Sequence, residues 1–421
     1  MFSHIRLHLR PRTMHPKAFM TDLNPEAMAL RASLTSMQKK LQKPAILQDL
    51  DASIPLQMGD HVVRARSLWN FSVVARGNKH ARRSQGVCVV GGAKAIRRIW
   101  RDYRVPPNVV YVPNTEPEVP SWCLEESLPS FIVRCPPVEV KKNLLSAEYS
   151  DGYAAEFPWH PSQLSPAASL FSEDHTAGED FAATGDDAAA ASPYDRRDAR
   201  LIRSMLVLVG LRIPSNVGML LRAAVDLKYD SVLLINSVDP FQEKVVRASE
   251  GAAFSPRMQL FEMPDTASCV SLLSNVALRH HLLPLIAVPS QGVKQAFEVA
   301  KHFHVHNARQ RQRVHAALTS SIPAGVLGPM LILGSESGGL RGLDDGEWGL
   351  PYQLLTLPLP NTIVDSHNVT VSGSILLNLF RPDAEAHFME CVAITGECLS
   401  SEKTNVPFWA EPEEVPHLSE N

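Results

Sequence analysis

The chain has 421 residues, 45% of them hydrophobic and 20% charged, with a formal net charge of −3. This length suits two globular domains with extensions, and no apolar run approaches the roughly 18–20 residues of a membrane-spanning helix, so we expect a soluble protein. The six cysteines include no C-x-x-C pair, which argues against a zinc site or a disulfide framework and predicts reduced thiols.

Residues 1–59 are predicted to form an N-terminal extension that precedes the first domain. Residues 1–20 contain Arg6, Arg10, Arg12 and Lys17 and no acid, which is typical of a mitochondrial transit peptide. The alternative is an untargeted N-terminus, with the protein cytoplasmic or nuclear. No function is assigned to the remainder of the extension.

Residues 60–164 are predicted to form a small α/β domain. Short apolar strands (VCVV at 87–90, VVYV at 109–112, FIV at 131–133) alternate there with helical stretches such as AKAIRRIWRDY. Between His61 and Thr115 eleven Lys or Arg residues face a single acid, Asp102. Such a concentration of positive charge predicts RNA binding. The candidate contacts are Lys79, Arg82, Arg83, Arg97 and Arg98.

Residues 165–198 are predicted to be an acidic flexible linker, because small and acidic residues cannot bury enough apolar surface to fold. A second α/β domain is expected over 199–385. Its apolar strands MLVLV, SVLLI, LPLIAV, MLILG and LLTLPL alternate with helical segments, which predicts a mostly parallel sheet with helices on both faces. Residues 386–421 are expected to be a loose tail.

One basic helical segment, residues 301–318, leaves two interpretations open. It contains four His together with Lys301, Arg309, Arg311 and Arg313. A solvated surface helix and a contact with the RNA backbone both fit this composition. The His spacing does not indicate a metal site.

Three segments of the second domain combine an apolar strand with a polar or Gly-rich turn. They are PSNVGMLLRAAVDL at 214–227, LILGSESGGL at 331–340 and LPLPNTIVDSHNVTVSGSILLNLF at 357–380. Ligands in parallel sheets bind beyond the carboxyl ends of strands, where all three turns are expected. Together they resemble motifs one, two and three of the SpoU/TrmH branch of the SPOUT RNA methyltransferases.

The resemblance implies a fold, a cofactor and partners. It implies a SPOUT-type sheet with a C-terminal trefoil knot, preceded by a substrate-binding domain shaped like a small ribosomal protein, which KHARRSQGVCVVGGAKAIRRIW is similar to. It also implies a homodimer, with 369–380 in the interface, and S-adenosyl-L-methionine bound by backbone groups. The implied cofactor-binding residues are Leu333, Gly334, Gly338, Gly339, Leu357, Leu359 and Asn368.

The implied reaction is methylation of a ribose 2′-hydroxyl in structured RNA, ribosomal RNA being favoured over transfer RNA, with no metal. The implied catalytic residues are Arg222, Asn216, Glu336, Ser366 and Asn368. An arginine is a poor base, so we expect Arg222 to hold the adjacent phosphate and stabilise the developing oxyanion. Glu336 either accepts the proton or fixes Asn216 and the knot loops.

The third motif departs from the family pattern, since His367 and Thr370 stand where Leu and Ser are usual and the loop before Ser366 is longer. This departure favours one alternative, a catalytically inactive homologue that binds RNA as a ribosome assembly factor. Two other interpretations, a dinucleotide-binding loop and the nucleophile elbow of a hydrolase, are unfavourable. VVGGAKA lacks the third Gly of a dinucleotide loop, and GSESG has Glu336 where a nucleophilic Ser would stand.

Overall fold

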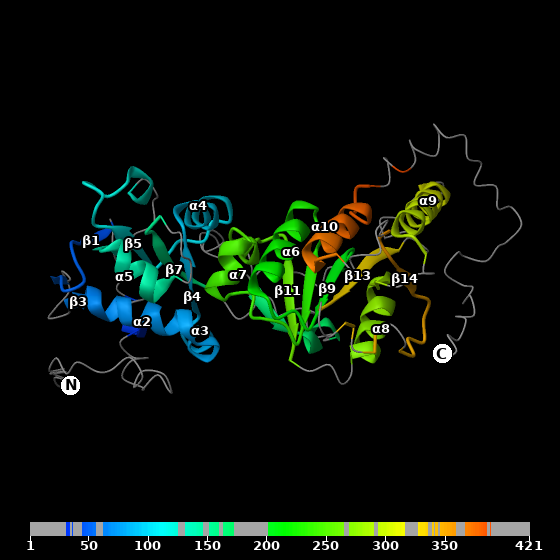
Figure 1. Cartoon of the computed structure of the whole chain (residues 1–421), viewed down its shortest axis with the longest axis horizontal. Coiled ribbons are helices and arrows are strands. Elements are labelled where there is room, and N and C mark those ends of the chain that lie inside the picture. The colour runs from blue at the N-terminus through cyan, green and yellow to red at the C-terminus, as the bar shows by residue number, and fades with distance from the viewer. Residues whose placement is uncertain are drawn as a thin grey trace, which may run out of the picture. The chain divides into compact units, whose positions relative to one another are not determined.

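The computed structural model describes two compact units, each with its own sheet (Figure 1). Unit 1 contains the described residues up to Ala93 and Pro106–Pro158, and unit 2 contains Lys94–Val105 and those from Trp159 onward. The residues that the structure describes are 31–33, 36, 44–55, 62–124, 131–145, 151–159, 163–171, 201–264, 269–289, 294–315, 327–335, 339–340, 342–343, 346–358, 367–384 and 388. The predicted leader, residues 172–198 of the predicted linker and most of the tail lie outside them. Residues 165–171, which we predicted to be flexible linker, instead form part of a short strand and a 3₁₀ helix.

Unit 1 has a five-stranded mixed sheet in the order β1-β6-β5-β7-β4. β7 is antiparallel to both its neighbours, and the other pairs are parallel. The strands are β1 (Ala45–Leu47), β4 (Val87–Gly91), β5 (Val109–Pro113), β6 (Phe131–Cys135) and β7 (Ala154–Pro158), and β2 (Ser53–Pro55) pairs separately with β3 (Val62–Arg64). The helices are α2 (Ala65–Gly77), α3 (Lys79–Gln85) and α5 (Pro137–Glu139).

The core of unit 1 forms between α2 and the sheet. Leu68, Trp69 and Phe71 of α2 are buried in one cluster with Tyr111 and Val133 of the strands. The apolar residues of α2 recur at helical spacing, whereas β4 and β5 are buried along their whole length, as expected of strands covered on both faces.

A buried carboxylate, Glu156 of β7, lies inside unit 1. Its oxygens accept hydrogen bonds from Ser72 Oγ at 2.8 Å and Asn108 Nδ2 at 3.1 Å, and Arg31 pairs with it. Arg31 is only 7% exposed, and its guanidinium lies 5.6 Å from the centroid of the Phe71 ring. The N-terminal extension therefore supplies the counter-ion of a core acid, a role that periodicity did not indicate.

Unit 2 is built on a seven-stranded sheet in the order β14-β12-β13-β9-β10-β11-β8, in which all pairs are parallel. The strands are β8 (Leu164–Pro166), β9 (Met205–Val209), β10 (Ser231–Ile235), β11 (Gln259–Met263), β12 (Leu282–Ala287), β13 (Gly328–Gly334) and β14 (Gln353–Leu355). The helices are α4 (Ala93–Arg97, continued by the π-helical turn Arg98–Asp102), α6 (Pro214–Asp226), α7 (Glu243–Ala248), α8 (Cys269–His280), α9 (Ala296–His315) and α10 (Val369–Leu379). The predicted α/β class and mostly parallel sheet are confirmed.

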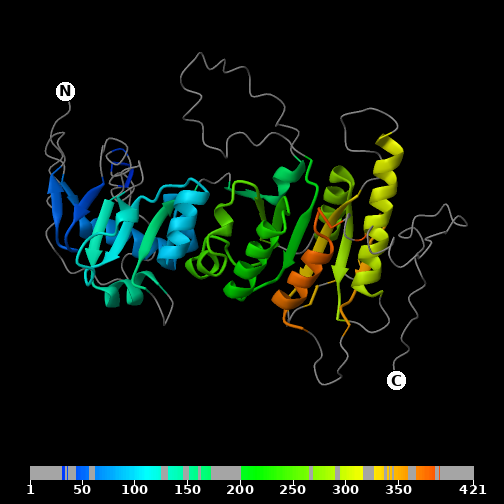
Figure 2. The same ribbon diagram turned by 90° about the horizontal axis from the view of Figure 1, so that it is seen from above.

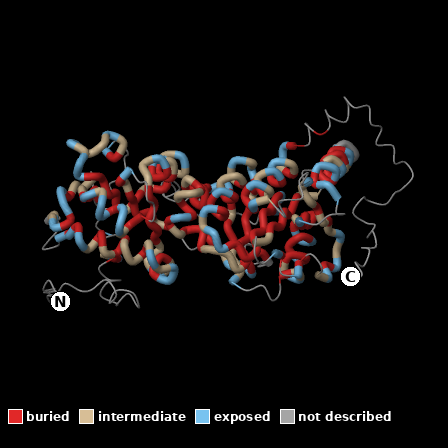
Figure 3. The backbone as a smooth tube through the Cα atoms, in the orientation of Figure 1, coloured by how far each residue is buried: buried red, intermediate tan, exposed pale blue. Residues whose placement is uncertain are grey.

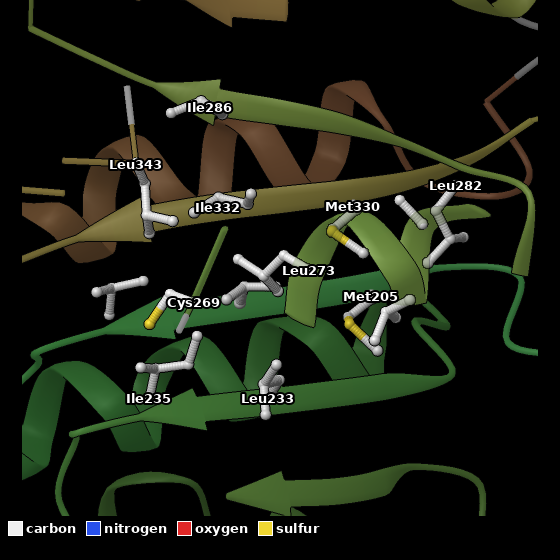
Figure 4. Packing of buried hydrophobic residues seen from close by; sticks show 14 of the residues in the cluster. Met205, Leu233, Ile235, Cys269, Leu273, Leu282, Ile286, Met330, Ile332 and Leu343 are labelled. Carbon is white, nitrogen blue, oxygen red and sulfur yellow. The ribbon is translucent and has the colours of Figure 1, made fainter. Parts of the chain in front are cut away.

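Helices cover both faces of the sheet of unit 2. Successive side chains along a strand point to opposite faces, and the apolar strand residues therefore pack against helices on each side. Met205, Leu233 and Ile332 pack in one cluster with Cys269 and Leu273 of α8 (Figure 4). On the opposite face, α6 and α10 lie side by side (Figure 2). The sheet is accordingly the most deeply buried part of the unit (Figure 3).

The observed grouping differs from the expected domain limits in two places. Lys94–Val105, assigned from sequence to the basic domain, groups with unit 2, and β8 pairs with β11 at the edge of the second sheet. Strand β11 also escaped prediction, because its sequence QLFEM contains Gln259 and Glu262 and resembles an amphipathic edge more than a core strand. The predicted knot depends on residues 359–366, which lie outside the described part, and it stays a prediction.

Candidate functional site

The first and second sequence motifs meet at one edge of the sheet. β9 and β13 are parallel neighbours, and Val209 at the end of β9 is in register with Gly334 at the end of β13. α6 begins at Pro214, shortly after the end of β9. Pro214 occupies the first turn of the helix, where its missing N–H costs no hydrogen bond. The turns that follow the two strands therefore begin side by side.

A direct contact joins the first motif to the third. Thr370 Oγ1 in α10 donates a hydrogen bond to Asn216 Oδ1 in α6 over 3.2 Å. Asn216 is only 5% exposed, so this bond lies in the packed interface of the two helices. Asn368 is the N-cap of α10, and its Oδ1 accepts a hydrogen bond from Thr370 N at 2.8 Å. Thr370, which replaces the usual Ser, keeps the hydroxyl that makes this link.

A close helix approach supports the same contact. A Cβ on Gly373 of α10 would lie 2.5 Å from Leu220 Cδ2 of α6 and 2.7 Å from Leu333 Cδ1 of β13. The absence of a side chain at Gly373 therefore lets Leu220 and Leu333 pack directly against α10. Leu333, a predicted cofactor neighbour, is thereby held at the junction of all three motifs.

Two residues of the second motif lie side by side just after β13. Ser335 and Gly339 exchange backbone hydrogen bonds of 3.2 and 2.9 Å. A Cβ on Gly334 would lie 2.5 Å from Gly339 O, so glycine is required there. Gly339 has φ +52° and is exposed, with no atom within 4 Å of the place where its Cβ would stand. The turn therefore offers backbone groups beside open space.

Several predicted site residues fall outside the described part of the chain. They are Glu336, Gly338, Leu359 and Ser366. Leu357 is described and half-buried just after β14, and His367 is half-buried before α10. Both interpretations of Glu336 therefore remain predictions.

Arg222 lies on a different face of α6 from Asn216. The two residues are six positions apart, which corresponds to about 240° around a helix. Arg222 Nη1 lies 2.9 Å from Glu250 Oε1, and Arg222 Nε lies 3.9 Å from Asp226 Oδ2. The structure thus joins Asn216 to the start of α10, and it joins Arg222 to an acid that sequence analysis did not select.

Glu250 forms ion pairs with three basic side chains. Lys94 Nζ lies 2.9 Å from Oε1, and Arg98 Nη1 lies 3.1 Å from Oε2, in addition to the contact with Arg222. The hydrogen bond from Lys94, aided by the charges of Arg222 and Arg98, lowers the pKa of Glu250. The only signal in the sequence was an acid followed by glycine after a helix, which is too common to single out a site.

The predicted RNA contacts are not all on the surface. Lys79 on α3 and Arg97 on α4 are exposed, and Arg83 is half-buried. Arg82 is 4% exposed, and its Nη1 donates hydrogen bonds of 3.0 Å to the carbonyl oxygens of Ala75 and Arg76 at the end of α2. The prediction of a phosphate contact for Arg82 was wrong, because this guanidinium caps a helix inside unit 1.

The basic segment around α9 is more than a solvated surface helix. Phe303 and His304 are buried, and His304 Nε2 lies 2.8 Å from the carbonyl oxygen of Leu379, the last residue of α10. Asn307 is also buried and bonds both backbone groups of Leu327 before β13. This helix therefore supports α10 and β13 from the side.

Neither a metal-ligand cluster nor a membrane-spanning helix occurs among the described residues. They contain no group of three or more His, Cys, Asp or Glu residues placed to hold a metal ion. They also contain no helix that combines the length and apolar character needed to cross a membrane.

The segment that carries the three motifs matches a known family. Residues 203–378 match the model of the SpoU rRNA Methylase family. This part of the chain belongs to the SpoU family. The predicted SpoU/TrmH relationship is thereby confirmed over the second domain. No protein with a curated description matches the chain.

Solved structures with a similar arrangement include three methyltransferases. A putative RNA methyltransferase of the TrmH family from Porphyromonas gingivalis is 19% identical, with 76% of this chain and 98% of that chain covered and a TM-score of 0.48. AviRb from Streptomyces viridochromogenes, a SpoU methyltransferase in complex with AdoMet, is 14% identical, with 77% and 99% covered and a TM-score of 0.49. An RNA 2′-O ribose methyltransferase is 19% identical, with 74% and 94% covered and a TM-score of 0.48. The family assignment rests on residues 203–378 and not on these three structures.

Proposed function

We propose that this SpoU-family protein transfers a methyl group from S-adenosyl-L-methionine to a ribose 2′-hydroxyl of structured RNA, with ribosomal RNA as the favoured substrate. The observation that carries the proposal is the Thr370–Asn216 hydrogen bond, which ties the first motif to the third beside the turn that ends β13. The match of residues 203–378 to the SpoU rRNA Methylase family supports it.

The turn at Gly334–Gly339 fits a ligand that is recognised by backbone groups. Gly339 is exposed beside open space, and Leu333 precedes the turn at the end of β13. Together with Gly338, Leu357, Leu359 and Asn368, these residues would hold the cofactor. When bound, S-adenosyl-L-methionine supplies an electrophilic methyl group.

The protein's own residues would orient the ribose and stabilise charge. The Arg222 side chain is 43% exposed although it is paired with Glu250, so it can also reach a phosphate or an oxyanion. A guanidinium is a poor base, so Arg222 serves as an electrostatic stabiliser. Asn216 and Asn368 would set the relative positions of α6 and α10.

Two further expectations belong to the same proposal. Val371 and Ile375 lie one turn apart on α10 and are 50% and 42% exposed, an apolar face that a second copy of the chain would cover. We therefore propose a homodimer through this helix, which sedimentation measurements test.

We also propose mitochondrial import, with any cleavage of the leader before Arg31, since unit 1 uses that side chain.

The decisive experiment compares the wild type with Arg222→Ala. We expect the substitution to reduce methyl transfer to RNA by about 10²–10³-fold, the usual cost of losing one stabiliser of a transition-state charge. Calorimetry with S-adenosyl-L-methionine should give an unchanged Kd. Wild-type turnover by the variant would refute the role of Arg222. Absence of cofactor binding by the folded wild-type protein would instead favour an RNA-binding assembly factor.

A further inference from the structure

A single carboxylate, that of Glu250, connects Arg222 to the basic segment Lys94–Val105. Its Oε1 contacts both Lys94 Nζ and Arg222 Nη1 at 2.9 Å, and its Oε2 contacts Arg98 Nη1 at 3.1 Å. All four residues belong to unit 2. The Glu250 side chain is 19% exposed, whereas that of Lys94 is 78% exposed, so the cluster opens to solvent on the lysine side.

The backbone at Glu250 is forced into an unusual conformation. Glu250 has φ +49°, in the left-handed region that is unfavourable for a residue with a side chain. Gly251 follows with φ +85°, and a Cβ there would lie 2.5 Å from Ile99 Cγ1. Packing against Ile99 therefore fixes the turn, and the turn aims the carboxylate at Arg222. Strained residues of this kind often mark functional positions.

The contact between α6 and α7 fixes the other side of the pair. A Cβ on Gly218 would lie 2.6 Å from Ala248 Cβ and 2.7 Å from the carbonyl oxygen of Val245. α7 ends two residues before Glu250, and Gly218 lies one turn before Arg222 on α6. The position of Arg222 relative to Glu250 is thus set by two rigid backbone contacts.

The charges of the cluster balance in the absence of RNA. Three cations, Lys94, Arg98 and Arg222, face Glu250 and the two outlying acids Asp102 and Asp226. The cluster is therefore no strong anion site as it stands. The segment that carries it is strongly basic, however, since Lys94–Val105 contains five Lys or Arg residues and one acid. A phosphate that binds there must compete with Glu250.

We propose that Glu250 is a positioning residue for Arg222, and that a phosphate of the RNA backbone takes Lys94 and Arg98 from Glu250 on binding. The carboxylate then holds Arg222 alone, and RNA docking on Lys94–Val105 is coupled to the placement of the arginine. This inference rests on the proposed function, because it assigns Arg222 to the methyl-transfer site.

The test measures RNA affinity and methyl transfer in Glu250→Gln, with Asp226→Asn as the matched control. Both substitutions remove one negative charge near Arg222, but Asp226 lies 3.9 Å away and outside hydrogen-bond distance. The probes are S-adenosyl-L-methionine and total RNA from cells that lack the protein. Melting temperature and cofactor affinity are measured alongside.

Opposite changes in affinity and turnover are expected for Glu250→Gln. RNA should bind about 2- to 5-fold more tightly, because a partly exposed competing acid is gone. kcat should fall about 10- to 100-fold, because Arg222 loses its fixed position. Glu250→Asp should recover part of kcat, and Asp226→Asn should stay near the wild type. In Lys94→Ala/Arg98→Ala, KM for RNA should rise and the salt dependence of binding should flatten by about two phosphate contacts.

Three outcomes would overturn the inference. Glu250→Gln could keep the wild-type kcat and RNA affinity. It could lose RNA binding, cofactor binding and melting temperature together, which indicates only a structural role. Asp226→Asn could also reproduce the whole pattern, which indicates a general charge effect. If the wild type itself transfers no methyl group, the proposed function fails separately, and unchanged RNA affinity in Glu250→Gln would still refute the competition with phosphate.

Discussion

Gly218→Ala tests whether the contact between α6 and α7 holds the site together. In an open helix this change stabilises a protein by about 1 kcal/mol, because alanine is the better helix former. Here the new Cβ would lie 2.6 Å from Ala248 Cβ and 2.7 Å from Val245 O. One of these atoms is a backbone oxygen, which cannot move without moving α7.

The two effects on Gly218→Ala have opposite signs, and overpacking should win. Forcing a methyl group into a packed contact costs about 1–3 kcal/mol, and more where backbone has to shift. Because backbone has to shift here, we take the upper part of that range, about 2–3 kcal/mol, and after subtraction of the helix-propensity gain we expect a net loss of about 1–2 kcal/mol. For a unit of this size that corresponds to a fall in Tm of about 2–8 °C. Methyl transfer should fall as well, because Arg222 and Glu250 move apart.

Two other glycines supply controls for Gly218. Gly77, at the end of α2, has no atom within 4 Å of the place where a Cβ would stand, so Gly77→Ala should raise the stability of unit 1 slightly. Gly373→Ala meets only the ends of the Leu220 and Leu333 side chains, which can shift, so its cost should be smaller than that of Gly218→Ala. Calorimetric unfolding checks the ranking. A Gly218→Ala protein as stable as the wild type would refute the reasoning.

The remaining predictions concern buried charge. Arg31→Ala should destabilise unit 1 by about 3–5 kcal/mol in urea unfolding, because it removes one partner of a buried ion pair; addition of Glu156→Gln should restore much of the loss, and its failure to do so would contradict the pairing. Burial lowers the pKa of His304 to about 4 from an ordinary value of 6.5, so the folded state keeps it neutral. Its contribution is present above pH 6.5 and is lost as pH falls toward 4, with about 2 kcal/mol gone by pH 5. His304→Gln should remove that part of the pH dependence, and identical acid sensitivity of the two proteins would argue against it.

Strand periodicity was a good guide wherever both faces of a strand are covered. β9 and β10 coincide with the predicted segments MLVLV and SVLLI, because strands buried along their whole length read as continuous apolar runs. The prediction was poorer near the two ends of the sheet, where β11, the strand beside the edge strand β8, contains polar residues and the edge strand β14 has only three residues. Three of the five β11 residues are only half-buried, and its sequence mixes polar and apolar residues accordingly.

Part of the candidate site could also be predicted from the sequence, and part could not. Asn216 and the start of α10 could be paired from the motifs, since the helices that follow parallel strands of one sheet begin at the same edge of it, and the Thr370–Asn216 bond agrees with that pairing. Arg82 illustrates the opposite case. A basic run looks like an RNA surface in any sequence, and only packing shows that this guanidinium bonds the end of α2.

The order of residues by itself determined the fold class, the SpoU relationship of residues 203–378 and the places where β9 and β13 end, because these depend on local patterns of apolar, polar and glycine positions. Only the tertiary structure decided the partners of the charges. Arg31 with Glu156, and Lys94 and Arg222 with Glu250, are separated by 28 to 156 positions along the chain. Ion pairs form between groups that packing brings within a few ångströms of each other. The charge of a side chain does not specify which partner it will meet.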